Sequence, residues 1–383
     1  MAHQPTINDL MNSSRIAVLG LGEAGFQLHM PALAQMAGIR IVGACDLDAR
    51  RRGKAAQTWG IPVFGNFEAM LAEARPDVLI VATPPDSHAR ICLDAIAAGC
   101  NVICEKPFTS TLEEADTVIA AAHTAGRRIA LNHEFREMPI FRAVLDEIGG
   151  LKGEQVVFAQ VWQHMDMAPW TEAGWRGSML RRTLHEGGVH LVDYLLALFG
   201  EKPRAVSATM SACGAHEPGA DVGADAVVIV SLEFSRGRLA QILQHRLCKG
   251  TTQYFELRAD TRAASYRASF GGRARVTAGL YRSTAPHIRF DYGVSGIAWR
   301  EVGNSRTVLA RNPKDPRVVA TRYVLERSLA AFADGGQPPA SALDGRDALE
   351  VINACYEAAT AGLRVRLAGT AGPQRATASV GRT

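Results

Sequence analysis

The stretch "RIAVLGLGEAGFQLHM", residues 15–30, decides the fold of this 383-residue chain. An apolar run at 16–19 is typical of a buried strand, and the amphipathic stretch at 24–36 is typical of a helix. The three glycines between them follow the pattern G-x-G-x-x-G. Glycines let the backbone turn tightly and approach a pyrophosphate, which the N-terminus of the following helix attracts. The stretch therefore predicts a strand, a phosphate-binding loop and a helix in succession.

The same alternation of strand and helix continues to residue 131. Short apolar runs are separated by amphipathic stretches, and the last of these opens at 111–114 with a capping-box signature. Buried strands that alternate with helices are typical of a doubly wound parallel sheet. The expected strands are 16–19, 39–45, 78–82, 101–104 and 128–131, and the expected helices are 24–36, 47–59, 66–74, 86–98 and 111–125.

The second half of the chain has a different pattern. A strand is expected over 156–162, and the runs 226–234 and 239–247 predict a β-hairpin, followed by a strand over 253–266. Helices are expected over 188–199, 322–333 and 346–360. This half is therefore predicted to be α+β, with an open and mostly antiparallel sheet.

These patterns divide the chain into an α/β Rossmann domain and an α+β domain. The helix at 346–360 closes the second domain and could pack back on the first. We expect a flexible arm over 1–14, a dinucleotide-binding Rossmann domain over 15–132, an α+β substrate and oligomerisation domain over 133–367 and a loose tail over 368–383.

The composition excludes several classes of protein. The net charge of +4, from 42 basic and 38 acidic residues, is too even to predict a nucleic-acid surface. The start of the chain lacks the pattern of a signal peptide, and no apolar run approaches the ~18–20 residues that span a bilayer. The seven cysteines form no C-x-x-C pair and predict reduced packing residues without a metal site. We expect a cytoplasmic protein without membrane or nucleic-acid partners.

An acidic residue supports the dinucleotide interpretation of the glycine loop. Asp46 ends the second expected strand, 21 residues after Gly25, where a carboxylate can bind the ribose hydroxyls of NAD. The same carboxylate would repel the 2′-phosphate of NADP. Arg51 and its arginine neighbours at 50 and 52 could reach that phosphate, or could form the solvated face of a helix. NAD is therefore the expected cofactor, and NADP is the less favoured one.

The stretch "CEKPF", residues 104–108, ends the fourth expected strand with an acid, a base and a proline. Pro107 removes a backbone donor and fixes its own φ angle, so the charged pair lies in a stiff turn. Such a turn at the carboxyl end of a strand is where α/β proteins bind ligands. By itself, the stretch could also be a surface ion pair beside a turn proline.

Together, several motifs resemble the Gfo/Idh/MocA family of oxidoreductases, from about residue 15 to 367. They are the glycine loop, "ACD" at 44–46, "VATPPDSHA" at 81–89, "AGCNVICEKPF" at 98–108, "EGGVHLVDYL" at 186–195 and "DALEVINACYEAATAGLRVRL" at 347–367. The resemblance implies that Lys106 lies beside the nicotinamide and faces the reacting hydroxyl. It also implies that the bond from Lys106 to Pro107 is usually cis and that Glu105 helps to hold the turn.

The family's second signature, D-x-G-x-H, appears here with glutamate in place of aspartate, as Glu186 and His190. A spacing of four puts both side chains on one face of a regular helix, where they can pair. A zinc site is not expected, because His185 and His190 are five residues apart. The resemblance implies that Lys106, His190 and Glu186 are catalytic.

Other site residues follow from the same motifs. His88 is expected to hold its loop near the cofactor. The candidate substrate contacts are Arg136, Trp162, Trp175 and Arg176; the tryptophans could stack on a sugar or belong to the core, and Arg176, Arg181 and Arg182 could bind an anionic group or face solvent. The expected cofactor-binding residues are Gly20, Gly22, Glu23, Ala24, Gly25, Asp46, Arg51, Thr83, Pro84, Pro85, His88, Glu105 and Lys106.

The expected activity is NAD(P)-dependent hydride transfer between nicotinamide and a secondary alcohol or ketone of a sugar, cyclitol or related polyol. Three alternatives stay open. They are a redox-neutral reaction that uses tightly bound NAD transiently, the reduction of another C=C or C=N bond, and a non-catalytic nucleotide sensor. The resemblance also implies a homodimer or homotetramer.

Overall fold

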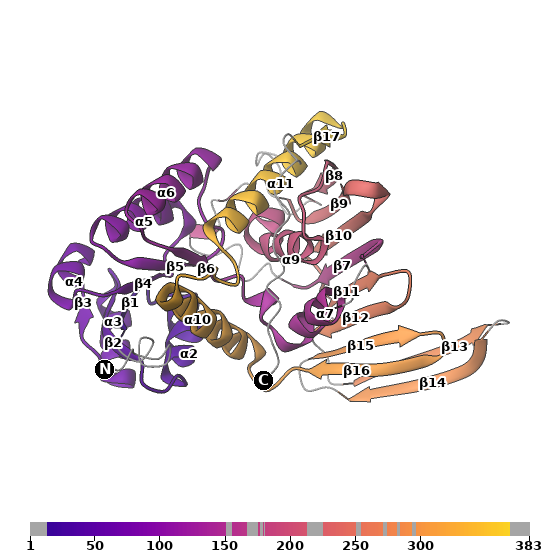
Figure 1. The fold of residues 1–383 in the computed structure, drawn as a ribbon, viewed down its shortest axis with the longest axis horizontal. Coiled ribbons are helices and arrows are strands. Elements are labelled where there is room, and N and C mark those ends of the chain that lie inside the picture. Colours follow the sequence, from indigo (N-terminus) through magenta and orange to yellow (C-terminus); the bar gives the residue numbers. More distant parts are fainter. Residues whose placement is uncertain are drawn as a thin grey trace, which may run out of the picture. The chain divides into compact units, whose positions relative to one another are not determined.

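The computed structural model describes residues 14–150, 155–166, 175–176, 179, 181–212, 225–249, 254–270, 274–281, 284–292 and 296–367 (Figure 1). The chain divides into one unit of Met1–Glu137 with Arg317–Leu349 and another of Met138–Pro316 with Glu350–Thr383. The domain boundary was predicted between residues 132 and 133, whereas the structure divides after Glu137. The segment Arg317–Leu349, which was predicted to belong to the second domain, groups with the first unit. The predicted tail at 368–383, and the predicted arm up to residue 13, lie outside the described residues.

The first unit contains the predicted parallel sheet. Its six strands lie in the order β3-β2-β1-β4-β5-β6, so the order reverses between β1 and β4, where doubly wound folds bind ligands. The doubly wound fold is confirmed. The two-residue strand β3 was not expected from the sequence, because it is too short for a periodic pattern. The strands are β1 (Arg15–Leu19), β2 (Arg40–Cys45), β3 (Val63–Phe64), β4 (Val78–Val81), β5 (Asn101–Cys104) and β6 (Ile129–Leu131).

Helices cover both faces of this sheet. One core joins the strands to α4, α5 and α6, and the other joins them to α2, α3 and α10. The capping box of α6 is confirmed, because Thr111 Oγ1 accepts from Glu114 N at 3.1 Å and Glu114 Oε2 accepts from Thr111 N at 3.2 Å. The helices are η1 (Gly25–His29), α2 (Met30–Ala34), α3 (Ala49–Trp59), α4 (Phe67–Ala74), η2 (Pro85–Ser87), α5 (His88–Ala97), α6 (Leu112–Thr124), η3 (Glu134–Arg136) and α10 (Pro316–Asp334).

The second unit is built on a nine-stranded sheet in the order β16-β15-β12-β11-β7-β10-β9-β8-β17. Its neighbouring strands are antiparallel except β7 and β10, so the predicted α+β class is confirmed. The single strand expected over 253–266 is wrong, because the chain turns there and forms a hairpin of β11 and β12. The strands are β7 (Phe158–His164), β8 (Ala205–Ser211), β9 (Val227–Glu233), β10 (Leu239–His245), β11 (Tyr254–Asp260), β12 (Ser265–Phe270), β15 (Gly296–Val302), β16 (Ser305–Arg311) and β17 (Val365–Arg366), with a separate pair of β13 (Ala274–Tyr281) and β14 (Thr284–Tyr292).

The described helical segments of the second unit include the 3-10 turn η6 (Ser235–Gly237) and three longer ones, and a further helix is shared with the first unit. The longer ones are α7 (Pro139–Gly149), the π-helical turn η5 (Thr183–Gly187) and α9 (Val189–Phe199), and Tyr194 of α9 donates to the carbonyl of Phe141 in α7 at 2.8 Å. The helix expected over 346–360 is part of α11 (Ala342–Ala361), whose residues up to Leu349 group with the first unit. None of the helices in the described ranges is both long enough and apolar enough to cross a membrane.

Candidate active site

The glycine loop of the first unit has the geometry of a phosphate cradle. Gly20 has a φ of 95°, and a Cβ there would lie 2.6 Å from the carbonyl oxygen of Ala82. A Cβ on Gly25 would collide with the carbonyl of Gly20. In contrast, a Cβ on Gly22 would meet Arg51 Nη1 at 3.7 Å, an ordinary contact with a flexible side chain. The outer glycines are thus required by packing, and the side of the loop at Gly22 is open for a pyrophosphate to approach.

Asp46 is fixed against this loop at the end of β2. Its Oδ2 accepts from the backbone N–H of Leu21 at 2.7 Å, and its Oδ1 accepts from the N–H of Asp48 at 2.8 Å. Arg51 Nη1 lies 3.5 Å from Oδ2, while Arg52 donates to the backbone carbonyls of Asp46 and Leu47. The carboxylate is therefore held in a defined orientation beside the loop, which fits the binding of a ribose diol.

The turn after β5 is organised by a buried carboxylate. Glu105 Oε1 accepts from His29 Nε2 at 2.8 Å and from Asn132 Nδ2 at 2.7 Å, and Oε2 accepts from the backbone N–H of Lys106 at 3.2 Å. Since a carboxylate can only accept, the proton of His29 lies on Nε2. The Lys106–Pro107 peptide bond is cis. Three donors from separate elements therefore fix the backbone from which the Lys106 side chain extends.

Two buried acids near Lys106 have pKa values that shift in opposite directions. Burial would raise the pKa of Glu105, but the hydrogen bond from His29, the nearby charge of Lys106 and the amide of Asn132 lower it to about 2. Burial raises the pKa of Glu134, although Arg317 and Lys106 act against this. Glu105 therefore stays ionised near neutral pH and places a permanent negative charge next to Lys106.

His88 joins the loop after β4 to the turn after β5. Its Nε2 lies 2.9 Å from the carbonyl of Thr83, and its Nδ1 lies 2.9 Å from the carbonyl of Pro107. Burial lowers the pKa of His88 despite these carbonyls, so a neutral ring donates to one of them at a time. Ser87 also donates to the carbonyl of Pro84 at 2.7 Å. The predicted loop of Thr83, Pro84 and Pro85 is thus connected to the turn at 105–107 that contains Lys106, the lysine turn.

In the second unit, the segment that carries Glu186 begins as a π-helical turn, η5. Asp225 caps this turn, because its carboxylate accepts from the backbone N–H groups of Arg182, Thr183 and Leu184 at 2.7–3.1 Å. Tyr356 donates to the same carboxylate at 2.8 Å. Four donors therefore fix the start of η5.

Glu186 and His190 lie on either side of the junction between η5 and α9. A π-helical turn is wider than an α-helical one, so the four-residue spacing does not by itself place both side chains on one face. Glu186 Oε1 accepts from Arg176 Nε at 3.1 Å, and the Glu186–His190 pair stays a prediction. Gly188 is required at the junction, because a Cβ there would collide with Gln244 Oε1 and with Leu184.

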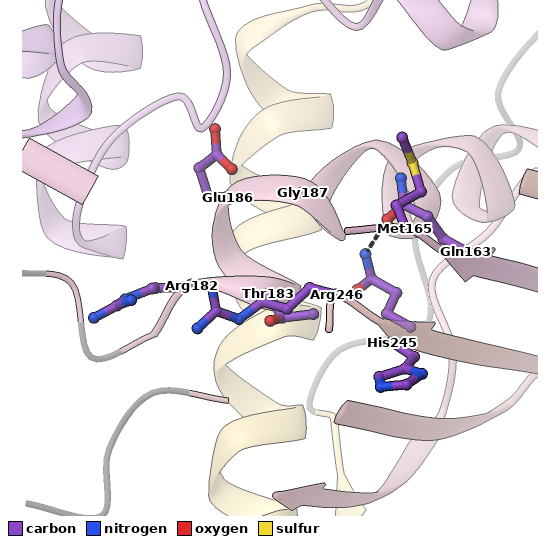
Figure 2. A pocket seen from close by; sticks show the side chains of 9 residues that line it. Gln163, Met165, Arg182, Thr183, Glu186, Gly187, His245 and Arg246 are labelled. Atoms are coloured by element: carbon purple, nitrogen blue, oxygen red, sulfur yellow. Dashed lines mark hydrogen bonds between the residues drawn. The ribbon is translucent and has the colours of Figure 1, made fainter. Parts of the chain in front are cut away.

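A pocket lies beside η5, within the second unit. It is lined by the ends of β7 and β10 and by η5 with the residue before it (Figure 2). Its lining includes two arginines, two glutamines, one glutamate and one histidine. The lining residues are Gln163, Met165, Arg182, Thr183, Glu186, Gly187, Gln244, His245 and Arg246.

The comparisons with known proteins agree with the two units. The profile described as "Oxidoreductase family, NAD-binding Rossmann fold" matches residues 14–133, and the profile of the GFO/IDH/MocA C-terminal domain matches residues 146–264. The chain belongs to the Gfo/Idh/MocA family. The predicted family is thus confirmed, and the chain is an NAD-dependent oxidoreductase.

Several members of the family match this Gfo/Idh/MocA chain over most of its length. D-apiose dehydrogenase of Paraburkholderia graminis is 24% identical over 351 residues, covering 88% of this chain and 86% of that protein. The aldose-aldose oxidoreductase of Caulobacter crescentus has the same fold, with a TM-score of 0.74, 20% identity and coverage of 92% and 99%. GenD2 of gentamicin A biosynthesis, solved with NAD, gives a TM-score of 0.74, 20% identity and coverage of 96% and 100%.

The predicted substrate contacts of this Gfo/Idh/MocA protein lie in different places. Arg136 is buried in the first unit, where it donates to the carbonyl of Pro339 at 2.9 Å and pairs with Asp344 at 3.2 Å. Trp162 precedes the pocket residue Gln163 in β7, so the two side chains point to opposite faces of the sheet.

The arginines before η5 differ in their contacts. Arg176 stacks 4.4 Å over the ring of Trp175 and binds Glu186, so both predicted residues lie next to a predicted catalytic acid. Arg181 is exposed and contacts Asn353 at 3.3 Å and the ring of Tyr356 at 4.7 Å. Arg182 lines the pocket. Arg181 therefore contacts two residues of α11, whereas Arg182 lies at the pocket.

His29 and Asn132, which donate to Glu105 in the lysine turn, were not predicted as site residues. Each is a polar residue at the end of an apolar segment, which is the signal that could have indicated them. His29 ends η1 with 0% exposure, and Asn132 follows the buried strand β6. In the described part of the chain, no three His, Cys, Asp or Glu side chains are grouped as a metal site.

Proposed function

We propose that this oxidoreductase transfers hydride between NAD and a secondary alcohol or ketone of a sugar, cyclitol or related polyol. The observation that carries the proposal is the lysine turn. Lys106 follows a buried, ionised glutamate with three fixed donors, at the carboxyl end of a strand in the same sheet as the glycine loop and Asp46. The names of D-apiose dehydrogenase and the aldose-aldose oxidoreductase support a sugar-like substrate.

The first unit fits NAD by its own residues. Gly22 would leave room for the pyrophosphate and Asp46 would accept from the ribose hydroxyls, while Thr83, Pro84 and His88 would lie at the nicotinamide end. When bound, the nicotinamide supplies the hydride chemistry, since it accepts a hydride from a carbinol carbon or returns one to a carbonyl. The remaining predicted cofactor residues, Glu23, Ala24, Pro85 and Arg51, belong to the same two loops and the start of α3.

We assign proton transfer to His190 and charge stabilisation to Lys106. During oxidation, His190 accepts the proton of the substrate hydroxyl, a role that suits an imidazole near neutral pH. Lys106 stabilises the negative charge that develops on the same oxygen. Glu186 orients the His190 ring and stabilises its protonated form. In reduction, the same groups return the proton.

A screen of sugars, inositols and other polyols with NAD and NADP tests the proposal. We expect at least one polyol to produce NADH, followed as absorbance at 340 nm. If a polyol is converted without any net change at 340 nm, a redox-neutral reaction with transiently used NAD replaces the proposal. If nucleotides bind but no polyol is converted, the protein is better described as a nucleotide sensor.

Cofactor choice gives a prediction for Asp46. The unmodified protein should bind NAD at least about tenfold more tightly than NADP, because like charges about 4 Å apart cost several kcal/mol at an intermediate dielectric. Asp46→Ser should weaken NAD binding and improve NADP binding, since Arg51 Nη1, now 3.5 Å from the carboxylate, can turn to a 2′-phosphate. Fluorescence titration of both cofactors measures the ratio.

Two variants control this titration. Asp94→Ser removes an acid of the same unit whose side chain is 45% exposed and pairs with Arg90 on α5, and should leave the NAD/NADP ratio unchanged. The double variant Asp46→Ser/Arg51→Gln should lose the gain in NADP binding. Tighter binding of NADP than of NAD by the unmodified protein would show that an arginine, and not Asp46, governs this site.

A further inference from the structure

A pair of glutamines ends an apolar row on the buried face of the second unit's sheet. Gln163 of β7 and Gln244 of β10 lie opposite each other in the parallel pairing of these strands. Successive residues of a strand point to opposite faces, so the residues two and four positions before each glutamine share its face. These residues are at most 1% exposed, and they are Ala159, Val161, Ala240 and Ile242. The amides therefore stand where the rest of the row is apolar core.

The two amides are joined by a hydrogen bond. Gln244 Nε2 donates to Gln163 Oε1 at 2.6 Å, and Figure 2 shows this bond as a dashed line. Gln244 is 2% exposed, and its Oε1 is buried without a hydrogen-bond partner among the described residues. A buried acceptor without a donor costs free energy, which an apolar side chain would avoid. Stability alone therefore does not account for a glutamine at this position.

The amide pair packs directly on the backbone where η5 joins α9. A Cβ on Gly188 would collide with Gln244 Oε1. A Cβ on Gly187 would lie 3.7 Å from Gln244 Nε2 and 4.0 Å from Gln163 Oε1. The link of Gly187 and Gly188 thus lies against the two amides with no side chain between them.

This glycine link connects the two residues to which we assign proton transfer. Gly187 and Gly188 are two of the three residues between Glu186 and His190. Glycine has more backbone freedom than any other residue, so the link does not fix its own conformation. Asp225 fixes only the start of η5, through three backbone N–H groups. The surface beside the link is therefore what can hold its other end.

We propose that Gln163 and Gln244 are positioning residues for proton transfer. The hydrogen-bonded pair holds the glycine link and thereby sets the position of Glu186 relative to the ring of His190. Both glutamines act through the link and not on the reacting atoms. This inference rests on the proposed function, in which His190 accepts the proton and Glu186 orients the ring.

The double variant Gln163→Met/Gln244→Met separates positioning from stability. Replacing both partners of a hydrogen bond with apolar groups of similar shape is nearly neutral for stability, but methionine is flexible and presents no fixed surface to the link. We expect a Tm close to that of the parent and a kcat about tenfold to a hundredfold lower, because a misplacement of about 1 Å can cost this much. KM should change less than kcat. A raised KM with the parental kcat would show a substrate contact instead and would overturn the inference.

The pH profile of kcat gives a second readout, which a purely structural role would not change. In the oxidation, His190 accepts a proton only as the neutral ring, so kcat rises with pH. When Glu186 no longer stabilises the protonated ring, this rise should move to lower pH in the double variant. A profile that keeps its midpoint while kcat falls would contradict the positioning of Glu186.

The matched control lies on the other face of the same two strands. Gln160 Nε2 donates to Gln241 Oε1, so β7 and β10 carry a second glutamine pair three positions earlier. Gln160→Met/Gln241→Met should leave kcat, KM and the pH profile unchanged. If this control loses as much kcat as the first double variant, the effect belongs to the strands and not to the pair at the glycine link.

NMR of the substrate-free protein separates a failure of this inference from a failure of the proposed reaction. The histidine rings are labelled with carbon-13, and the His190 signal is identified by its loss in His190→Gln. We expect this signal to shift in Gln163→Met/Gln244→Met and to stay in place in the control. If it shifts but no polyol yields NADH, the positioning role stands and the dehydrogenase reaction is wrong. An unmoved His190 signal, or a parental kcat, in the folded double variant would refute the inference.

Discussion

Replacing Lys106 with alanine should lower kcat by at least about a hundred- to thousandfold, the usual effect of removing a group that stabilises developing charge. The dissociation constant of NAD should change little, because the glycine loop and Asp46 are untouched. Lys106 is held through its own backbone N–H, which donates to Glu105, so the alanine variant keeps the turn. Stopped-flow measurement of NADH formation, together with fluorescence titration of NAD, separates the two effects.

Lys54→Ala is the control for loss of a lysine charge in the same unit. Lys54 lies on α3, exposed, with its amine 4.3 Å from the ring centre of Phe26. This variant should keep the kcat of the parent enzyme. A Lys106→Ala enzyme that turns over within a few-fold of the parent would refute the role of Lys106.

Glu105→Ala should destabilise the first unit by about 3 kcal/mol or more, since removing one partner of a buried charged group leaves the others unsatisfied. Three donors lose their acceptor at once, from His29, Asn132 and the backbone of Lys106. A loss of this size corresponds to a fall in Tm of roughly 5–10 °C. The turnover number should fall as well, because the lysine turn is no longer fixed.

The lowered pKa of Glu105 predicts that the stability of the first unit depends on pH. The folded pKa of Glu105 is lowered to about 2, so its ionised form stabilises the fold above the unfolded value of about 4.3. This contribution decreases as the pH falls from that value through 2. The difference in Tm between the parent and Glu105→Ala should therefore be constant from pH 7 to pH 5 and should narrow at pH 4 and pH 3.

An exposed acid of the same unit provides the comparison. Asp116 pairs with Arg346 at 2.6 Å, and its side chain is 56% exposed. Asp116→Ala should lower the free energy of unfolding by at most about 1 kcal/mol, as is usual for surface ion pairs. If Glu105→Ala melts within one degree of the parent, the buried network does not stabilise the turn as described.

The sequence alone predicted those parts of the site whose position depends on residues close together in the chain. The glycine loop follows a strand and opens a helix, Asp46 ends the next strand, and Lys106 lies in a proline turn, so each could be placed from neighbouring residues. His29 and Asn132 could not, because their bonds to Glu105 cross 76 and 27 positions of the chain. Those contacts exist only once the strand order of the sheet is known.

The pocket of the second unit depends on strand pairing in the same way. Periodicity assigns a side chain to a face of a sheet but does not say which strand lies beside it. The parallel pairing of β7 with β10 places Gln163 opposite Gln244. This pairing could not be expected from the sequence, which predicted a mostly antiparallel sheet. The π-helical turn at η5 was also not predictable, because its five-residue bonding leaves no distinct apolar pattern.

In the proposed reaction, hydride passes directly between a carbinol carbon and the nicotinamide. A polyol from the screen, carrying deuterium on the carbon that is oxidised, tests this most directly. After a single turnover, mass spectrometry of the recovered nucleotide should show one deuterium in the nicotinamide ring for each ketone formed. Ketone or rearranged product formed without deuterium in the nucleotide would contradict hydride transfer.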